Sequence, residues 1–399
     1  MDLFSLSRQE SDKTLLVELF KAYKDARKNK RAKKSQLLFE FEYERKLIKL
    51  HKQIVNRTYK PLKSSAFIST KPVIREVFAA HFQDRIIHHL IYNQINPIFE
   101  KEFIENSYSC RKGKGTLYGV NRIFDFIQNS SENYSKDAYI LKLDIQGYFY
   151  SINKNILYDR VKSTLLKERN SLKIDFENID YLIRETIFTD PTKNVYIHKD
   201  KDNWDKLPKN KSLFFAKKGC GLPIGNLTSQ LFSNIYMDIL DKYITQDLMV
   251  EHYGRYVDDF VLIHRDKKYL FSLVEKIKIF LNDVLHLTLH PKKIYFQHYS
   301  KGVKFLGAYM KPYVKYVDKR TKNNFYKLIN KINNELILYS SDDVYLKKIR
   351  NSINSYLGTM VHFSSYRLRT KILSQLNSLF YKYFLIDKNV TKVILKEYY

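Results

Sequence analysis

The sequence has few cysteines, no long apolar run and no low-complexity tract. Its two cysteines, Cys110 and Cys220, have no His or Cys nearby at the spacing of metal ligands, which argues against a zinc site. No apolar stretch approaches the roughly 20 residues that a helix needs to cross a bilayer. Residues 1–10 also lack the apolar core of a signal peptide. We therefore expect a soluble, cytoplasmic protein.

Acidic residues are also scarce. The chain has 42 Asp and Glu against 70 Lys and Arg, so its formal charge is +28 and its pI about 9.6. This balance points to a polyanionic partner, of which nucleic acid is the obvious candidate. The alternative is a basic surface without a partner, as in Lys-rich proteomes. The 32 Tyr and 26 Phe are interleaved with lysines, a pattern compatible with aromatic stacking on bases beside phosphate contacts. Most of these rings, however, are expected in the core.

A chain of 399 residues suits two or three lobes. Hydrophobic periodicity predicts helices and strands in the order of an α+β domain whose helices cover one face of a sheet. The expected helices are 15–50, 82–99, 228–243, 270–285, 323–338, 344–363 and 366–384, and a further helical pattern begins near Lys154. The expected strands are 66–69, 73–78, 139–144, a hairpin over 253–264, and 293–297, and residues 190–218 read as a long loop or small β insertion.

Three carboxylates stand at strand ends or turns: Asp144, and the adjacent pair Asp258 and Asp259. Clustered carboxylates repel one another unless cations neutralise them, and hard oxygen ligands select magnesium or manganese. Two such ions about 4 Å apart serve in-line phosphoryl transfer. Taken singly, each Asp has an ordinary alternative as a turn residue or a helix cap.

The order of the surrounding motifs resembles that of reverse transcriptases. Residues 143–149 resemble the first carboxylate motif of that family, 221–230 the second motif, and 256–259 the catalytic hairpin. Residues 287–293 and 305–307 resemble the fourth motif and the primer grip, and 107–111 fall where a fingers motif lies. The resemblance implies an RNA-directed DNA polymerase with a right-hand fold, an antiparallel-sheet palm and a helical thumb.

The implied regions are an N-terminal helical region at 1–59 and fingers at 60–135. A palm would follow at 136–300, with an insertion at about 165–218, and the primer grip and helical thumb at 301–399. The N-terminal helix would pack behind the fingers or bind RNA. RNA template, DNA or RNA primer and dNTPs are the implied partners, and two Mg²⁺ ions, with Mn²⁺ as the substitute, are the implied cofactors.

The resemblance also assigns roles to the metal-binding residues. Asp144 and Asp258 would bridge both metal ions, Asp259 would assist, and the carbonyl of Ile145 would bind the nucleotide-side ion. Lys293 would protonate the leaving pyrophosphate, with Lys292 as the alternative.

Nucleotide contacts are implied for two arginines, a lysine and a short loop. Arg75 and Arg111, with Lys71, would grip the triphosphate, because a guanidinium matches phosphate oxygens; the alternative is solvated surface charge. Phe149 would exclude a sugar 2′-hydroxyl, unless it is a core aromatic. Ile224, beside Gly225, stands where many relatives have a Gln, and its aliphatic side chain cannot make the hydrogen bonds of an amide. It would therefore lower fidelity, unless it only packs under the loop. The primer grip would be Phe305, Leu306 and Gly307.

Within the family, several segments resemble reverse transcriptases of diversity-generating retroelements. They are Ile224–Gly225 with Ser229–Gln230, residues 190–194 and 207–212, and residues 355–358 with His362. This resemblance implies a bacterial or phage-encoded enzyme that copies a template-repeat RNA into cDNA with errors at adenines, for mutagenic retrohoming with a small basic accessory protein. The alternatives are a retron or abortive-infection (phage-defence) reverse transcriptase, or a non-catalytic RNA-binding scaffold with a polymerase fold.

Overall fold

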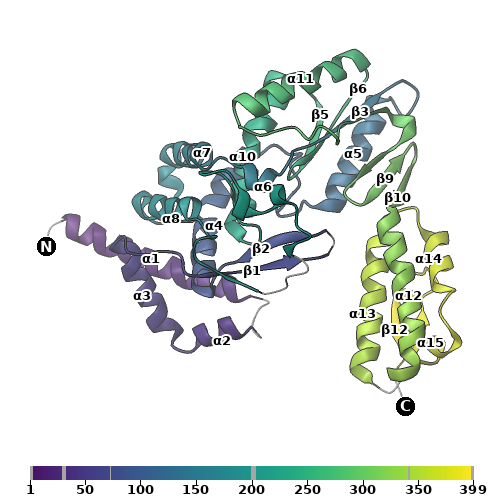
Figure 1. The fold of residues 1–399 in the computed structure, drawn as a ribbon, viewed down its shortest axis with the longest axis horizontal. Coiled ribbons are helices and arrows are strands. Elements are labelled where there is room, and N and C mark those ends of the chain that lie inside the picture. Colours follow the sequence, from purple (N-terminus) through teal and green to yellow (C-terminus); the bar gives the residue numbers. More distant parts are fainter. Residues whose placement is uncertain (1–2, 29–32, 72, 199–203, 340–341, 397–399) are drawn as a thin grey trace. The chain divides into compact units, whose positions relative to one another are not determined.

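The structure is a computed structural model that describes residues 3–28, 33–71, 73–198, 204–339 and 342–396 (Figure 1). The chain forms two compact units. The first contains residues 1–111, 143–260 and 272–294, and the second contains residues 112–142, 261–271 and 295–399. The predicted fingers, 60–135, are thus divided between the two units, and the predicted region boundaries remain a prediction.

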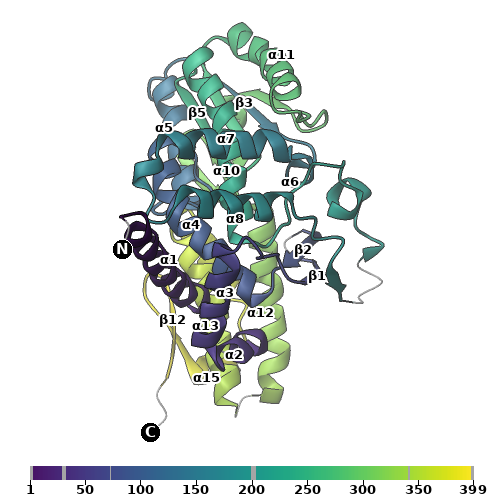
Figure 2. The same cartoon turned by 90° about the vertical axis from the view of Figure 1, so that its left-hand side faces the viewer.

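The first unit begins with three helices: α1 (Leu3–Arg27), α2 (Lys34–Glu40) and α3 (Tyr43–Val55). The prediction of one helix over 15–50 is wrong, because Glu42 adopts a left-handed backbone conformation that no helix continues through. Helices α1 and α2 pack on α4 (Phe82–Glu102), and Figure 2 shows α1 and α3 beside α4. The N-terminal region therefore lies against the main helix of the unit.

A three-stranded sheet carries the predicted fingers strands. Strands β1 (Ser64–Ser69) and β2 (Arg75–Ala79) pair antiparallel, and β4 (Val195–Ile197) from the insertion pairs parallel with β1. The insertion also contains a helix, α8 (Phe176–Phe188), which the sequence analysis did not predict. Buried Glu76 in β2 accepts hydrogen bonds from the Ser212 hydroxyl and the Leu213 amide. The insertion is therefore bonded into the sheet.

The predicted palm elements are present. The short helix α6 (Tyr148–Ser151) precedes α7 (Lys154–Lys167), and α7 packs on α8 and on α10 (Leu227–Lys242). A four-stranded sheet has the order β5-β6-β3-β7. Its strands are β3 (Tyr139–Asp144), β5 (His252–Tyr256), β6 (Asp259–His264) and β7 (Tyr295–His298), and α11 spans Lys267–Asp283. The predicted hairpin at 253–264 is confirmed by β5 and β6.

The second unit has its own apolar core, built by helices around Phe325, Ile353 and Phe380. The prediction of a single helix over 366–384 is wrong, because this segment forms two helices, α14 (Tyr366–Leu373) and α15 (Ser378–Tyr383). Asn377 caps the second helix by accepting a hydrogen bond from Phe380 N. Its helices are α5 (Thr116–Ser130), α12 (Lys319–Tyr339), α13 (Asp343–Met360), α14 (Tyr366–Leu373) and α15 (Ser378–Tyr383). Its short strands are β8 (Val303–Phe305), β9 (Ala308–Lys311), β10 (Val314–Val317), β11 (Phe384–Ile386) and β12 (Val393–Leu395).

The combination of helices with largely antiparallel sheets is the predicted α+β class. Among the described residues, no helix is long and apolar enough to cross a membrane.

Candidate active site

The three predicted aspartates come together in the first unit. Asp144 is the last residue of β3, Asp258 lies in the hairpin turn, and Asp259 begins β6. Burial, together with the negative charges of Asp144 and Asp259, raises the pKa of Asp258 to about 6, and the positive charge of Lys293 opposes this shift. The carboxylates are therefore close enough to act on one another electrostatically, which is the arrangement that a cation site requires.

Lys293 reaches this cluster because its segment follows the end of β3. His290 N donates to the Asp144 carbonyl at 2.8 Å, and Gln146 N donates to the Thr288 carbonyl at 2.9 Å. These bonds place the Lys293 ammonium 2.8 Å from Asp144 Oδ1. Of the two candidate lysines, Lys293 is the one that contacts Asp144, and its role as a proton donor stays a prediction.

The glycine-rich loop before α10 joins two other parts of the site. Leu222 N donates to the Phe149 carbonyl at 2.8 Å, and Phe78 N in β2 donates to the Ile224 carbonyl at 2.8 Å. Gly225 has a φ of +119°, and a Cβ there would lie 2.8 Å from Val77 Cγ1. Only glycine accepts both this conformation and this close approach. The loop therefore holds Ile224 between the first carboxylate motif and the fingers sheet.

Ile145 and Phe149 follow Asp144 in the chain and differ in their burial. Ile145 is buried and forms an isolated antiparallel bridge with Leu289. Phe149 is half-buried, and its ring meets the edge of Tyr148, with 5.4 Å between the ring centroids. Phe149 is thus only partly covered by the protein, and its role as a gate stays a prediction.

The predicted phosphate-binding residues differ in their surroundings. Arg75 is exposed on β2; burial raises the pKa of Tyr256, and the charge of Arg75 opposes this shift, so the guanidinium lies near the catalytic hairpin. Lys71 is exposed in the turn that joins β1 and β2. Both cations are accessible to a polyphosphate.

Arg111 is more enclosed than the other two predicted phosphate-binding residues. Its side chain is only 5% exposed and pairs with Glu100 at 2.8 Å. The same guanidinium donates to the Ile104 and Ser107 carbonyls at 2.6 and 2.9 Å. Its Nε and Nη1 groups are thus bonded within the protein, so Arg111 stabilises the 104–111 segment, and its role as a triphosphate ligand stays a prediction.

A buried ion pair that was not predicted from the sequence lies next to the hairpin of β5 and β6. Arg255 in β5 and Asp241 in α10 are both fully buried and lie 2.5 Å apart. The signal was available, because an arginine within an otherwise apolar strand requires an acidic partner.

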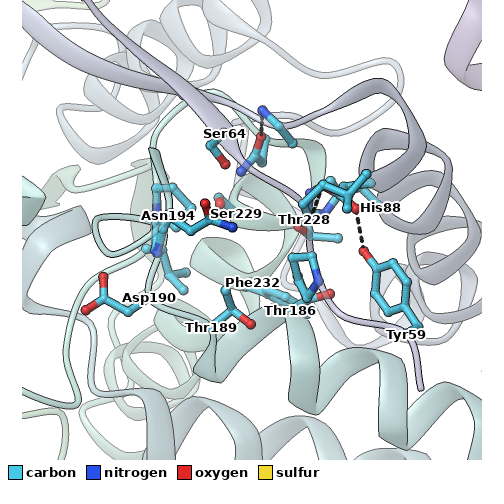
Figure 3. Close-up of a pocket in the computed structure, with 18 residues that line it drawn as sticks. Tyr59, Ser64, His88, Thr186, Thr189, Asp190, Asn194, Thr228, Ser229 and Phe232 are labelled. Atoms are coloured by element: carbon cyan, nitrogen blue, oxygen red, sulfur yellow. Dashed lines mark hydrogen bonds between the residues drawn. The ribbon is translucent and has the colours of Figure 1, made fainter. Parts of the chain in front are cut away.

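A cavity of about 60 Å³ lies behind the loop that carries Leu222 and Pro223 (Figure 3). Two buried polar pairs line it: the Tyr59 hydroxyl donates to Asp84 at 2.8 Å, and the Thr228 hydroxyl lies 2.7 Å from His88 Nδ1. Figure 3 also places Asp190, Asn194 and Ser229 around this cavity. Residues from the 190–194 segment and Ser229 at the start of α10 thus meet at one cavity.

The predicted primer grip belongs to the second unit. Phe305 is fully buried in β8, so it is a core residue. Leu306 and Gly307 form the partly exposed turn into β9 with positive φ angles, and Asp318 N donates to the Gly307 carbonyl at 3.0 Å. The turn is the part that a primer can touch.

The donor types at the aspartate cluster fit a hard divalent cation. Asp144, Asp258 and Asp259 offer carboxylate oxygens, which Mg²⁺ and Mn²⁺ prefer. In the described parts of the chain, however, no three His, Cys, Asp or Glu side chains are already arranged around one ion position. The chemistry of the cluster therefore fits the predicted metals, although its side chains do not form a complete ligand shell.

Comparisons with known proteins agree with the motif order. The family model described as reverse transcriptase (RNA-dependent DNA polymerase) matches residues 71–310. No curated protein matches the chain.

Solved telomerase structures are similar at low identity. Apo telomerase from Candida tropicalis is 14% identical, with 80% of this chain and 60% of that chain covered and a TM-score of 0.47. Telomerase from Candida albicans, in complex with a TWJ fragment of telomeric RNA, is 12% identical, with 87% and 65% covered and a TM-score of 0.46. The chain thus spans less than two thirds of the length of these telomerases.

Proposed function

This chain belongs to the reverse transcriptase family, with the α+β right-hand polymerase fold of that family, and from this premise we propose that it is an RNA-directed DNA polymerase. The observation that carries the proposal is the meeting of Asp144 with Asp258 and Lys293 in the first unit. The RNA template, the primer and the dNTPs are proposed partners. The net charge of +28 supports a nucleic-acid partner.

Each residue has a proposed task in nucleotide addition. Asp144, Asp258 and Asp259 would hold two Mg²⁺ ions, with the Ile145 carbonyl as a further ligand. When bound, these ions supply charge stabilisation for in-line displacement at the α-phosphate. Lys293 would donate a proton to the leaving pyrophosphate, and Arg75 and Lys71 would bind the triphosphate oxygens. Phe149 would exclude a 2′-hydroxyl, so that dNTPs are preferred.

Primer extension on an RNA template with Mg²⁺ tests the proposal. We expect the wild type to add dNTPs and Asp258→Asn to lose at least about 10³-fold in rate, because a carboxylate that holds charge in the transition state is removed. Arg169→Ala, at an exposed ion pair with Glu177, is the matched control and should keep full activity. A wild-type protein without incorporation would instead favour the non-catalytic RNA-binding scaffold.

We also propose a finer assignment: error-prone cDNA synthesis on a template-repeat RNA in a diversity-generating retroelement, with a small basic accessory protein. The support is the aliphatic Ile224 and the resemblance of 190–194, 229–230 and 355–358 to that group. The test is the error spectrum of the extended products. Misincorporation concentrated opposite template adenines agrees with this assignment, and a uniform error spectrum would favour a retron or abortive-infection type.

A further inference from the structure

The Arg255 guanidinium is fully buried directly before the catalytic turn. Its Nε and Nη2 donate to the two carboxylate oxygens of Asp241 at 2.7 and 2.5 Å. Nη2 also donates to the Ser107 hydroxyl at 3.1 Å, and Nη1 lies 3.5 Å from Asn234 Oδ1. Its remaining contact is to the backbone of the turn, where Nη1 donates to the Val257 carbonyl at 2.9 Å.

That carbonyl belongs to a residue in an unfavourable conformation. Val257 has a φ of +58°, in the left-handed region, where a β-branched side chain is strained. Such a conformation persists only where surrounding contacts determine it. The peptide that follows leads into Asp258, so the orientation of the Val257 carbonyl sets the direction in which the chain enters the aspartate pair.

The guanidinium itself is fixed from two sides. Tyr253 donates its hydroxyl to Asp241 Oδ1 at 2.7 Å, so Asp241 accepts from both neighbours on β5. The backbone of Arg255 is held as well, because its N donates to the Asn106 carbonyl and its carbonyl accepts from Tyr108 N, both at 2.9 Å. Arg255 therefore has little freedom to move. Because its guanidinium bonds both α10 and the turn, the position of α10 determines the position of the turn.

On the premise that the chain is the polymerase proposed above, we propose that Arg255 and Asp241 form a positioning pair. Asp241 orients the guanidinium, the guanidinium holds the Val257 carbonyl, and this contact directs Asp258 and Asp259 toward the metal ions. Neither residue touches substrate or metal, so neither is catalytic. Loss of this contact should therefore change the Mg²⁺ requirement of the reaction first.

The test measures steady-state primer extension as a function of Mg²⁺ concentration. Arg255→Lys keeps the charge but cannot make a forked set of bonds, and Asp241→Asn removes the charge that orients the fork. We expect each to lower kcat at least about tenfold and to raise the half-saturating Mg²⁺ concentration at least about threefold. The KM for dNTP and the affinity for RNA should stay within about twofold.

The same helix offers a matched control. Asp238 in α10 is also fully buried and pairs with Arg160 and Lys242 at 3.0 and 2.7 Å. Its partners lie outside the hairpin, so Asp238→Asn should lower the thermal midpoint without changing the half-saturating Mg²⁺ concentration. If Asp238→Asn shifts the Mg²⁺ requirement as much as Asp241→Asn does, general destabilisation explains both and the positioning role is overturned.

Two further variants keep the test decisive. Ser107→Ala removes one bond to the guanidinium without uncovering a charge, and it should raise the half-saturating Mg²⁺ concentration about twofold even if Arg255→Lys does not fold. Val257→Gly removes the conformational strain, so Arg255→Lys should cost less in that background than in the wild type. A folded Arg255→Lys variant with the wild-type Mg²⁺ requirement overturns the proposal, whereas an inactive wild type would refute only the polymerase function.

Discussion

At the residue scale, Ile224 shows how a backbone and a side chain can have separate tasks. Its carbonyl accepts the hydrogen bond from Phe78 N, which any residue at this position can do. Its side chain is only half-buried and offers no polar group to a base pair. A substitution at this position can therefore change selectivity without breaking the loop.

We predict that Ile224→Gln lowers misincorporation opposite template adenine, by roughly tenfold, because an amide restores hydrogen bonds that discriminate geometry. The measurement is single-nucleotide primer extension with matched and mismatched dNTPs. Ile224→Val, which stays aliphatic, is the control and should keep the wild-type error rate. An unchanged error rate in Ile224→Gln would mean that Ile224 only packs under the loop.

At the element scale, the contact between α4 and α10 contains a titratable group. His88 in α4 lies next to Thr228 in α10, and burial lowers the pKa of His88 to about 3, with smaller contributions from His89 and Arg85. The unfolded chain has an ordinary histidine pKa near 6.5. Between these two values the unfolded state binds a proton that the folded state does not, so the free energy of unfolding falls as the pH falls from about 6.5 toward 3.

We therefore predict that the wild type loses stability between pH 7 and pH 4.5 and that His88→Gln loses less, by on the order of 2 kcal/mol. Guanidinium unfolding at the two pH values measures the difference. Exposed His286→Gln is the control and should follow the wild type. Equal pH dependence in His88→Gln and the wild type would show that His88 is not held neutral by the fold.

Much of the element order could be predicted, and the exceptions have physical causes. The hairpin with Asp258 and Asp259 was predictable because two apolar strands flank a polar turn. The strand β4 was predictable only as an unspecified β segment, since its parallel partner β1 is distant in the sequence and no local pattern encodes that pairing. The break before α15 depends on Asn377, because its side chain caps the first turn of α15 and so favours a new helix over a continuous one.

The acidic residues of the candidate site could be predicted from the sequence, whereas the residues that position them were harder to predict. Asp144 and Lys293 follow from motif resemblance, and the structure brings them into contact. The burial of Arg111 could not be inferred from the sequence, because it depends on an ion pair with Glu100 in α4. Arg255 was visible in the sequence as a charge within an apolar strand, but its partner Asp241 becomes evident only in the fold.

At the scale of the whole molecule, the excess of 28 positive charges should dominate affinity for RNA. Each phosphate neutralised on a single strand contributes a slope of about −0.7 to the dependence of log K on log salt. With only three such contacts, affinity falls roughly 20-fold when salt rises from about 50 to 200 mM. Fluorescence anisotropy of a labelled RNA measures the slope, and Asp258→Asn, as a control, should give the same slope. A slope near zero would contradict binding through the basic surface.

The bonds between the end of β3 and residues 288–290 have a consequence for biosynthesis. During translation, Asp144, Asp258 and Asp259 emerge from the ribosome before His290 and Lys293 do. Until those two arrive, the three acids lack the ammonium of Lys293 and the His290 amide that donates to the Asp144 carbonyl. The proposed catalytic centre is therefore completed late in synthesis, because His290 and Lys293 are translated after the three aspartates.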